Sequence, residues 1–358
     1  MADHGLLPPG KSADTTSIKL NSSHVKLGPE KVLDVAGNDF PGHWPGQSNH
    51  WDLNQFKKIL NIKICRLSSS TLEFDLVGID ASIANALRRI MIAEVPTVTI
   101  EDVFVWNNTS LVHDEVLAQR LGLIPLQVDP RLIDMRSTDG ATDLNTLVFK
   151  LVVNCRRLPN VSKNETDASK IYQNSIVTSG MLQWEAKGDQ LSIFKDKPPQ
   201  PVQDDIVLVK MRPGQEIRAE MHCVKGIGKD HAKFSPVATA SYRLLPHIII
   251  HEPIPEADCE KFQSCFAPGV IEIVQNSKGI KECRVKNPRK DTVSREALRH
   301  PEFEGKVSLG RVRDHFIFNV ESTGVYSPEE IPLEACSVLL EKIRSVRAGL
   351  EWQTSRMA

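Results

Sequence analysis

Hydrophobic and polar residues alternate with a period of two in several stretches of the chain, which is the pattern of a β-strand with one buried face. Residues 59–79 predict a β-hairpin whose buried face carries Ile62, Ile64, Leu72, Phe74 and Leu76. The stretch RDHFIFNVESTG, residues 313–324, predicts a strand that ends in a turn at Gly324. Further strand-like runs occupy residues 147–153, 181–186, 205–211, 217–224 and 235–250.

A helical period follows the hairpin in IDASIANALRRIMIAEVP, residues 79–96. On a helical wheel Ile83, Leu87 and Ile90 lie on one half, together with small alanines. This broad apolar stripe predicts a helix face that packs on a core.

The other half of the same wheel carries two adjacent arginines, Arg88 and Arg89, with Asn85 and Ile92 beside them. One interpretation is a solvent-exposed face with a single stray apolar residue, which is common on protein surfaces. The alternative is a face that a partner covers, because guanidinium is the cation best suited to interfaces. The helical wheel alone does not distinguish a solvent-exposed face from one that a partner covers.

The C-terminal region predicts a long amphipathic helix. Ser327-Pro328-Glu329-Glu330 supplies a capping serine, a proline at the first helical position and a capping-box glutamate. Apolar residues then recur at helical spacing, at Ala335, Leu339, Ile343, Val346 and Leu350. A shorter helix is predicted in HDEVLAQRLG, residues 113–122, where Gly122 and the nearby Pro125 would stop it.

Composition limits the class of protein. A chain of 358 residues can hold two or three compact units, and its hydrophobic share of 41% and charged share of 25% are those of a soluble folded protein. The 44 basic and 45 acidic residues nearly cancel, which argues against a protein that coats nucleic acid. Seven scattered cysteines favour a reducing compartment.

Residues 1–55 form a candidate N-terminal arm. They are rich in Pro, Gly, Ser, Asp and Asn and lack sustained periodicity, which predicts an extended or disordered segment. Trp44 and Trp51 do not fit this interpretation well, because a tryptophan stabilises a protein mainly by burying its large apolar surface, and an exposed one does not. We therefore expect the end of the arm to dock on a surface.

The glycine- and lysine-containing loop KGIGKDHAKFSPV, residues 225–237, is the best candidate for a phosphate site. It matches neither the P-loop nor the dinucleotide fingerprint, which would need glycine at His231. A tight turn is the stronger interpretation. Direct nucleic-acid binding through Lys225, Lys229 and Lys233 is a weaker one, given the balanced net charge.

Cysteine and histidine spacing gives no clear metal site. Cys259, Cys265 and Cys283 follow neither zinc nor iron–sulfur spacing. Buried structural thiols are therefore favoured over the alternative, a metal site with His300 as a fourth ligand. His247 and His251 are separated by three isoleucines, which favour a strand and place the two rings too far apart to share a metal. We predict no cofactor, and the lack of catalytic motifs argues mildly against an enzyme.

Four stretches, in this order along the chain, resemble the α-like assembly subunits of RNA polymerases, the family of the bacterial α chain and its archaeal D-type counterpart. They are GIDASIANALRRIMIAEVP, DEVLAQRLGLIPL, GIGKDHAKFSPVATASYR and HFIFNVESTGVYSPEE. FPGHWPG, AEVPTVTIEDVFVWNNTS and NPRKDTVSREALRHPEFEGKVSLGRVRDHF are similar to the branch shared by RNA polymerases I and III. The polymerase II branch carries a cysteine-rich zinc loop after the equivalent of residue 100, and this sequence has no cysteine there.

The resemblance implies an α+β fold with a discontinuous dimerisation domain, formed by residues 56–97, 233–250 and 309–358. It further implies an inserted α+β domain at 98–232 and a small module at 251–308 that resembles a degenerate ferredoxin-like insert.

The same resemblance implies two interfaces in a nuclear and nucleolar polymerase. A smaller α-like subunit would form a heterodimer with this chain through Ile83, Leu87, Ile90, Leu339, Ile343 and Val346. The second-largest, catalytic subunit would bind Asn85, Arg88 and Arg89. The chain would then act as a non-catalytic assembly platform, with DNA met only through the complex.

Overall fold

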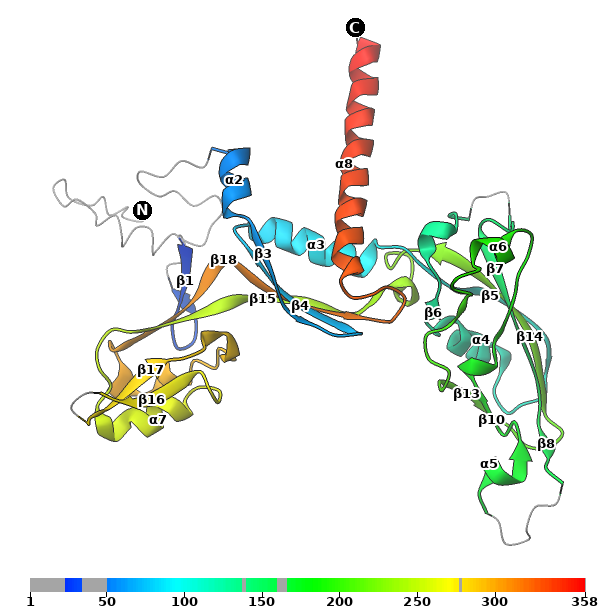
Figure 1. The fold of residues 1–358 in the computed structure, drawn as a ribbon, viewed down its shortest axis with the longest axis horizontal. Coiled ribbons are helices and arrows are strands. Elements are labelled where there is room, and N and C mark those ends of the chain that lie inside the picture. Colours follow the sequence, from blue (N-terminus) through cyan, green and yellow to red (C-terminus); the bar gives the residue numbers. More distant parts are fainter. Residues whose placement is uncertain (1–22, 34–49, 137–139, 160–165, 277–278, 358) are drawn as a thin grey trace, which may run out of the picture. The chain divides into compact units, whose positions relative to one another are not determined.

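The structure is a computed structural model that describes residues 23–33, 50–136, 140–159, 166–276 and 279–357 (Figure 1). The chain divides into two compact units. Unit 1 comprises residues 1–63, 74–84 and 242–318, and unit 2 comprises 64–73, 85–241 and 319–358. Within the described residues, no helix is both long and apolar enough to span a membrane.

A six-stranded sheet contains the longest strands of the chain. Its order is β2 (Val32–Leu33), β1 (His24–Leu27), β18 (Val307–Ser322), β4 (Thr71–Val77) and β3 (Asn61–Leu67), and β15 (Val237–Ile250) also pairs with β18. Strand β1 runs antiparallel to β18, with His24 opposite Val312 and Leu27 opposite Leu309.

Unit 1 contains a small module packed around its own hydrophobic core. Its elements are α7 (Cys259–Ser264) and the antiparallel pair β16 (Ile271–Gln275) and β17 (Lys281–Val285), with short 3-10 turns at Glu256–Asp258, Pro288–Lys290, Glu296–Arg299 and Pro301–Phe303. Phe262 and Phe303 are fully buried and meet edge to face, 5.1 Å between ring centroids. Leu27 from β1 joins this core. Helix α2 (Leu53–Ile59) belongs to the same unit but buries none of its residues.

Unit 2 contains a four-stranded antiparallel sheet in the order β11 (Gln183–Glu185), β7 (Thr146–Asn154), β14 (Glu216–Gly226) and β5 (Thr97–Asn108). One face buries Phe149, Met221 and Ile100 with Leu117 and Leu121 of α4 (Asp114–Gly122). Smaller elements are α5 (Ala168–Ile171), α6 (Gln190–Ile193), the 3-10 turns Pro130–Leu132, Ser179–Met181 and Ala232–Phe234, and the strand pairs β6–β12 (Leu126–Gln127, Gln200–Pro201), β8–β9 (Arg156–Arg157, Tyr172–Gln173) and β10–β13 (Ile176–Thr178, Val207–Lys210).

The predicted helices are present, as α3 (Ala81–Ala93) and α8 (Glu330–Met357), and the mixture of helices and sheets confirms the α+β class. Helix α8 begins three residues after its predicted cap. The carboxylate of Glu330 still accepts a hydrogen bond from the Ser327 backbone N–H at 3.1 Å, which is the predicted capping-box bond.

Three expectations about the N-terminal third were wrong. Strand β3 is exposed along its whole length, so Ile62 and Ile64 do not contribute to a buried face. Residues 24–33 of the arm form β1 and β2 instead of an irregular segment. Trp51 is exposed and packs only locally on Phe56, at 4.9 Å, while Trp44 lies outside the described residues.

Candidate functional site

Helix α8 presents an apolar row that no described residue covers. Its first turns are anchored, because Ile331 and Ala335 are fully buried, but every residue from Leu340 to Arg356 is exposed. Leu339 is half-buried, while Ile343, Val346 and Leu350 are 56%, 65% and 59% exposed. The spacing of four, three and four residues places all four on one side of the helix, as in the seam of a coiled coil. In Figure 1 no other element of unit 2 accompanies the second half of α8.

Polar contacts fix the start of α8 within unit 2. The guanidinium of Arg131 lies 3.4 Å from Glu330 and 3.2 Å from Glu334. It also binds Asp129, and although burial alone would raise the pKa of that carboxyl, the hydrogen bonds from Arg131 lower it below its usual value. The Tyr326 hydroxyl donates to the Pro96 carbonyl at 2.9 Å, and burial raises the pKa of this hydroxyl. The helix is therefore held at its base.

Helix α3 places the three predicted stripe residues in unequal environments. Ile90 is buried, Leu87 is half-buried and Ile83 is exposed. The buried side of the helix is instead centred on Ala84 and Met91. The apolar side is thus partly open toward the N-terminal end of the helix.

The two arginines of α3 differ in their contacts. Arg88 donates to the Asn85 side-chain oxygen at 3.2 and 2.9 Å, so these two predicted residues lie together. Arg89 is exposed and forms no ion pair with any described residue. Ile92 is half-buried, because the loop of residues 225–237 covers the end of α3. Gly228 packs against the Ile92 carbonyl, and the Lys229 backbone N–H donates to the Ala93 carbonyl at 2.8 Å.

The loop at 225–237 behaves as a packed turn. A Cβ at Gly226 would lie 2.6 Å from the Phe234 ring, and one at Gly228 would lie 2.4 Å from the Ile92 carbonyl oxygen. The Lys225 and Lys233 ammonium groups donate to the carbonyls of Ile133 at 3.1 Å and Ile100 at 2.8 Å. Both glycines and both lysines thus have structural partners within unit 2.

The three central cysteines lie in the hydrophobic core of unit 1. Cys259 donates to the Pro255 carbonyl at 3.4 Å and Cys283 to the Cys259 carbonyl at 3.7 Å. Burial raises the pKa of the Cys283 thiol to about 12, which disfavours the thiolate that a metal would need. Among the described residues, no group of three or more His, Cys, Asp or Glu is placed to hold a metal ion.

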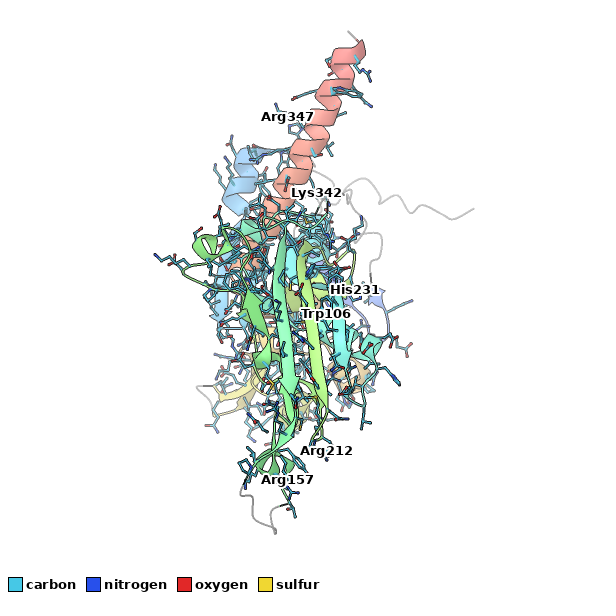
Figure 2. All side chains as sticks on the ribbon, turned by 90° about the vertical axis from the view of Figure 1, so that its right-hand side faces the viewer. Trp106, Arg157, Arg212, His231, Lys342 and Arg347 are labelled. Carbon is cyan, nitrogen blue, oxygen red and sulfur yellow. The ribbon has the colours of Figure 1, made fainter. Side chains whose placement is uncertain are left out.

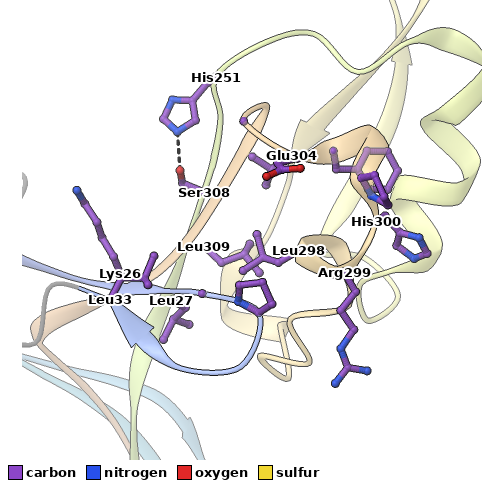
Figure 3. A pocket seen from close by; sticks show the side chains of 16 residues that line it. Lys26, Leu27, Leu33, His251, Leu298, Arg299, His300, Glu304, Ser308 and Leu309 are labelled. Carbon is purple, nitrogen blue, oxygen red and sulfur yellow. Dashed lines mark hydrogen bonds between the residues drawn. The ribbon is translucent and has the colours of Figure 1, made fainter.

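A pocket of about 500 Å³ opens in unit 1 between the turn that joins β1 to β2 and residues 298–309 (Figure 3). His251 and Ser308 lie 2.7 Å apart at its edge. A serine–histidine pair resembles part of a hydrolase triad, but no carboxylate among the described residues hydrogen-bonds to His251. His247 lies within β15, as the isoleucine run predicted, and its ring packs on His24.

Comparison with known proteins identifies the family. The RNA polymerase Rpb3/Rpb11 dimerisation domain matches residues 73–343. The chain belongs to the Rpb3/Rpb11 family of RNA polymerase subunits. Within this family, a mouse relative described as DNA-directed RNA polymerases I and III subunit RPAC1 is 50% identical over 90% of this chain and 93% of its own length. The yeast Saccharomyces cerevisiae relative of the same description is 48% identical over 90% and 96%. A Dictyostelium discoideum RNA polymerase II subunit rpb3 is 30% identical over 83% and 97%.

Sequence reasoning missed an exposed aromatic face in this Rpb3/Rpb11 family member. Phe104 and Trp106 lie on the side of β5 that does not face the core, and both are exposed. The sequence TVTIEDVFVW already indicated such a face, because large apolar residues occupy both the odd and the even positions and therefore both sides of the strand. A strand with two apolar faces indicates that something covers each of them.

Proposed function

We propose that this chain is a non-catalytic core subunit of RNA polymerases I and III that serves as their assembly platform. The relatives are described as subunits of those two polymerases, and the matched domain is named for dimerisation. The observation that carries the proposal is the exposed row on α8, because an apolar seam of this length is costly to leave in water.

In this proposal a smaller α-like subunit forms a heterodimer with the chain. Leu339, Ile343 and Val346 of α8 supply the seam, and Ile83, Leu87 and Ile90 of α3 extend the apolar surface. Ile83 and Leu87 are the members of the α3 stripe that remain accessible. A partner helix that packs along α8 would bury the row by side-chain interdigitation, as in a coiled coil.

The second-largest, catalytic subunit binds the arginine face in the same proposal. Arg88 is held by Asn85, which orients its guanidinium, while Arg89 is exposed and ready to pair with a carboxylate. The proposed dimerisation domain consists of residues 56–97, 233–250 and 309–358, with the inserted domain at 98–232 and the small module at 251–308. The assembled enzyme acts in the nucleus, including the nucleolus, in the synthesis of rRNA, 5S rRNA and tRNA.

Co-expression tests the proposal. The chain produced with the smaller α-like subunit is expected to elute as a stable 1:1 complex, whose mass light scattering measures. Produced alone, it is expected to aggregate because its apolar helix surfaces stay open. A well-behaved monomer that does not bind the smaller subunit would contradict the assignment.

A further inference from the structure

The outer face of the four-stranded sheet in unit 2 carries an unusual group of side chains, which we call the Trp106 face. It consists of Phe104, Trp106, Lys150, Val152, Arg218 and Glu220. Strand register brings them together: Arg218 lies opposite Val152, and Glu220 lies opposite both Phe104 and Lys150. Trp106, Val152 and Phe104 are 71%, 62% and 47% exposed. Figure 2 shows Trp106 on the face of the sheet that is turned toward the viewer.

The Trp106 face is hollowed and can seat an apolar group. A hollow of about 420 Å³ is lined by three apolar residues, Trp106, Val152 and Ala219, and by three charged ones, Lys150, Arg218 and Glu220. Three large apolar side chains on the solvent face of one sheet form a patch of the kind that marks interaction sites on soluble proteins. Tryptophan and arginine, both present here, dominate the energetics of protein interfaces.

The charges around the Trp106 face are not balanced. Lys150 pairs with Glu185 and lies 3.8 Å from Glu220, and Lys187 also pairs with Glu185, so two lysines offset these two acidic side chains. The hydrogen bond from Lys150 accordingly lowers the pKa of Glu185. Arg218 has no acidic partner among the described residues.

Three more exposed arginines lie at one end of the same sheet. Arg156 and Arg157 form β8, which is separated from the end of β7 by one residue, and Arg156 lies about 13 Å along the chain from Val152. Arg212 precedes β14, and its guanidinium packs over the Tyr172 ring, 5.7 Å from the centroid. Figure 2 shows Arg157 and Arg212 together beyond the end of the sheet that carries Trp106. None of the three forms an ion pair in the part of the chain that the structure describes.

We propose that the Trp106 face binds an acidic segment of a partner protein that inserts a large apolar side chain into the hollow. The apolar anchor would pack against Trp106 and Val152, and acidic residues beside it would pair with Arg218 and with the arginines at the end of the sheet. This surface lies outside α3 and α8 and adds a further partner to the proposed function. A nucleic acid fits less well, because its phosphates would pair with the arginines but leave the apolar walls of the hollow unused.

A photo-crosslinker tests the proposal in the assembly that the chain forms in its own cells. Trp106 is replaced by p-benzoylphenylalanine in the tagged full-length chain, the complex is irradiated, and the crosslinked fragment is sequenced. The control places the same crosslinker at Leu191, which is 69% exposed on α6. We expect a crosslinked peptide in which Asp or Glu flanks a Leu, Ile, Phe or Met, and roughly tenfold less product when Arg218→Glu is added, since like charges now oppose each other.

The matched charge control is Lys195→Glu, an exposed lysine of unit 2 away from this face, which should leave the crosslink unchanged. Four results would overturn the proposal: no product above the Leu191 control, a crosslink to nucleic acid, a peptide without acidic residues, or a yield that Arg218→Glu does not alter. Polymerase subunits recovered in the same preparation report on the proposed function separately, so the two ideas can fail independently.

Discussion

The ammonium group of Lys342 on α8 lies 2.8 and 2.9 Å from the two carboxylate oxygens of Glu94, the residue that follows α3. This ion pair links α8 to the C-terminal end of α3, and Glu94 and Lys342 both belong to unit 2. Its side chains are 53% and 27% exposed, so water screens the attraction.

Lys342→Ala is therefore expected to lower the free energy of unfolding by less than about 1 kcal/mol, the usual range for an exposed pair. Urea denaturation of the two proteins in the same buffer measures the difference. A larger loss would show that this pair, and not the buried base of α8, positions the helix. The exchange of charges in Glu94→Lys with Lys342→Glu should restore part of any loss.

Ile343→Asp is expected to weaken the heterodimer by roughly a hundredfold or more, because the change removes about 2 kcal/mol of apolar burial and desolvates a charge. The isolated fold should be little affected, since Ile343 is 56% exposed. Arg344→Asp, on the other side of the helix, is the matched control. Co-expression of each variant with a limiting amount of the smaller α-like subunit, followed by pull-down, measures both, and equal recovery would refute the role assigned to the row.

Arg89→Ala is expected to abolish binding of the second-largest subunit while it leaves the heterodimer intact. The loss corresponds to about 2–5 kcal/mol if the guanidinium is paired and desolvated in the interface. Pull-downs with each partner separate the two effects, and Arg284→Ala, an exposed arginine of unit 1, serves as the control. Equal weakening of both partners would contradict the assignment of two different faces to α3.

Gly228→Ala is expected to destabilise the protein by about 1–3 kcal/mol, because the new methyl group would lie 2.4 Å from the Ile92 carbonyl oxygen. Gly349→Ala is the matched control, with no atom within 4 Å of the added methyl group. In the middle of α8 it should stabilise the helix by roughly 0.5–1 kcal/mol. If Gly228→Ala unfolded at a higher temperature than Gly349→Ala, the packing role assigned to this loop would be wrong.

Asp75 should make the protein sensitive to acid. Burial alone would raise the pKa of this carboxyl, but Arg289 at 2.5 Å and His315 at 3.1 Å hold the pKa below its usual value in the fold. A carboxyl whose pKa is lower in the folded state stabilises the fold above its unfolded pKa, and this contribution is lost as the pH falls through the folded value. Asp75→Asn should thus cost about 3 kcal/mol near neutral pH and progressively less below about pH 4.

Urea unfolding over this range measures the gap between wild type and Asp75→Asn. The exposed Asp205→Asn is the control and should leave the stability profile unchanged. A gap that stays constant as the pH falls from neutral to well below the unfolded pKa would show that the network of Asp75, Arg289 and His315 does not contribute through its charge.

Periodicity predicted the helices and the long strands because each of them has a buried side. Helix α4 and helix α8 fall within three residues of where the pattern placed their starts, and β18 covers most of the predicted stretch 313–324 but begins earlier, at Val307. The same reasoning failed at β3, because alternation shows that one side of a strand is apolar but not whether this chain covers it. Ile62 and Ile64 are apolar and exposed for that reason.

The candidate site was predictable in its chemistry but not in its geometry. The row on α8 follows from spacing alone, whereas the exposure of Ile83 and the bond between Arg88 and Asn85 depend on how α3 packs. Strand β1 was missed since four residues with a single buried leucine give no periodic signal. The long-range contacts of Gly228 and Asp75 also required three-dimensional positions.

The uncovered second half of α8 affects how long a newly synthesised, unassembled chain persists in the cell. Until another polypeptide packs along it, the helix exposes several turns of apolar surface. Chaperones and proteases bind such surfaces and refold or degrade the chains that carry them. We expect surplus copies to be short-lived in cells, so that the supply of the matching subunit sets how much of this one survives.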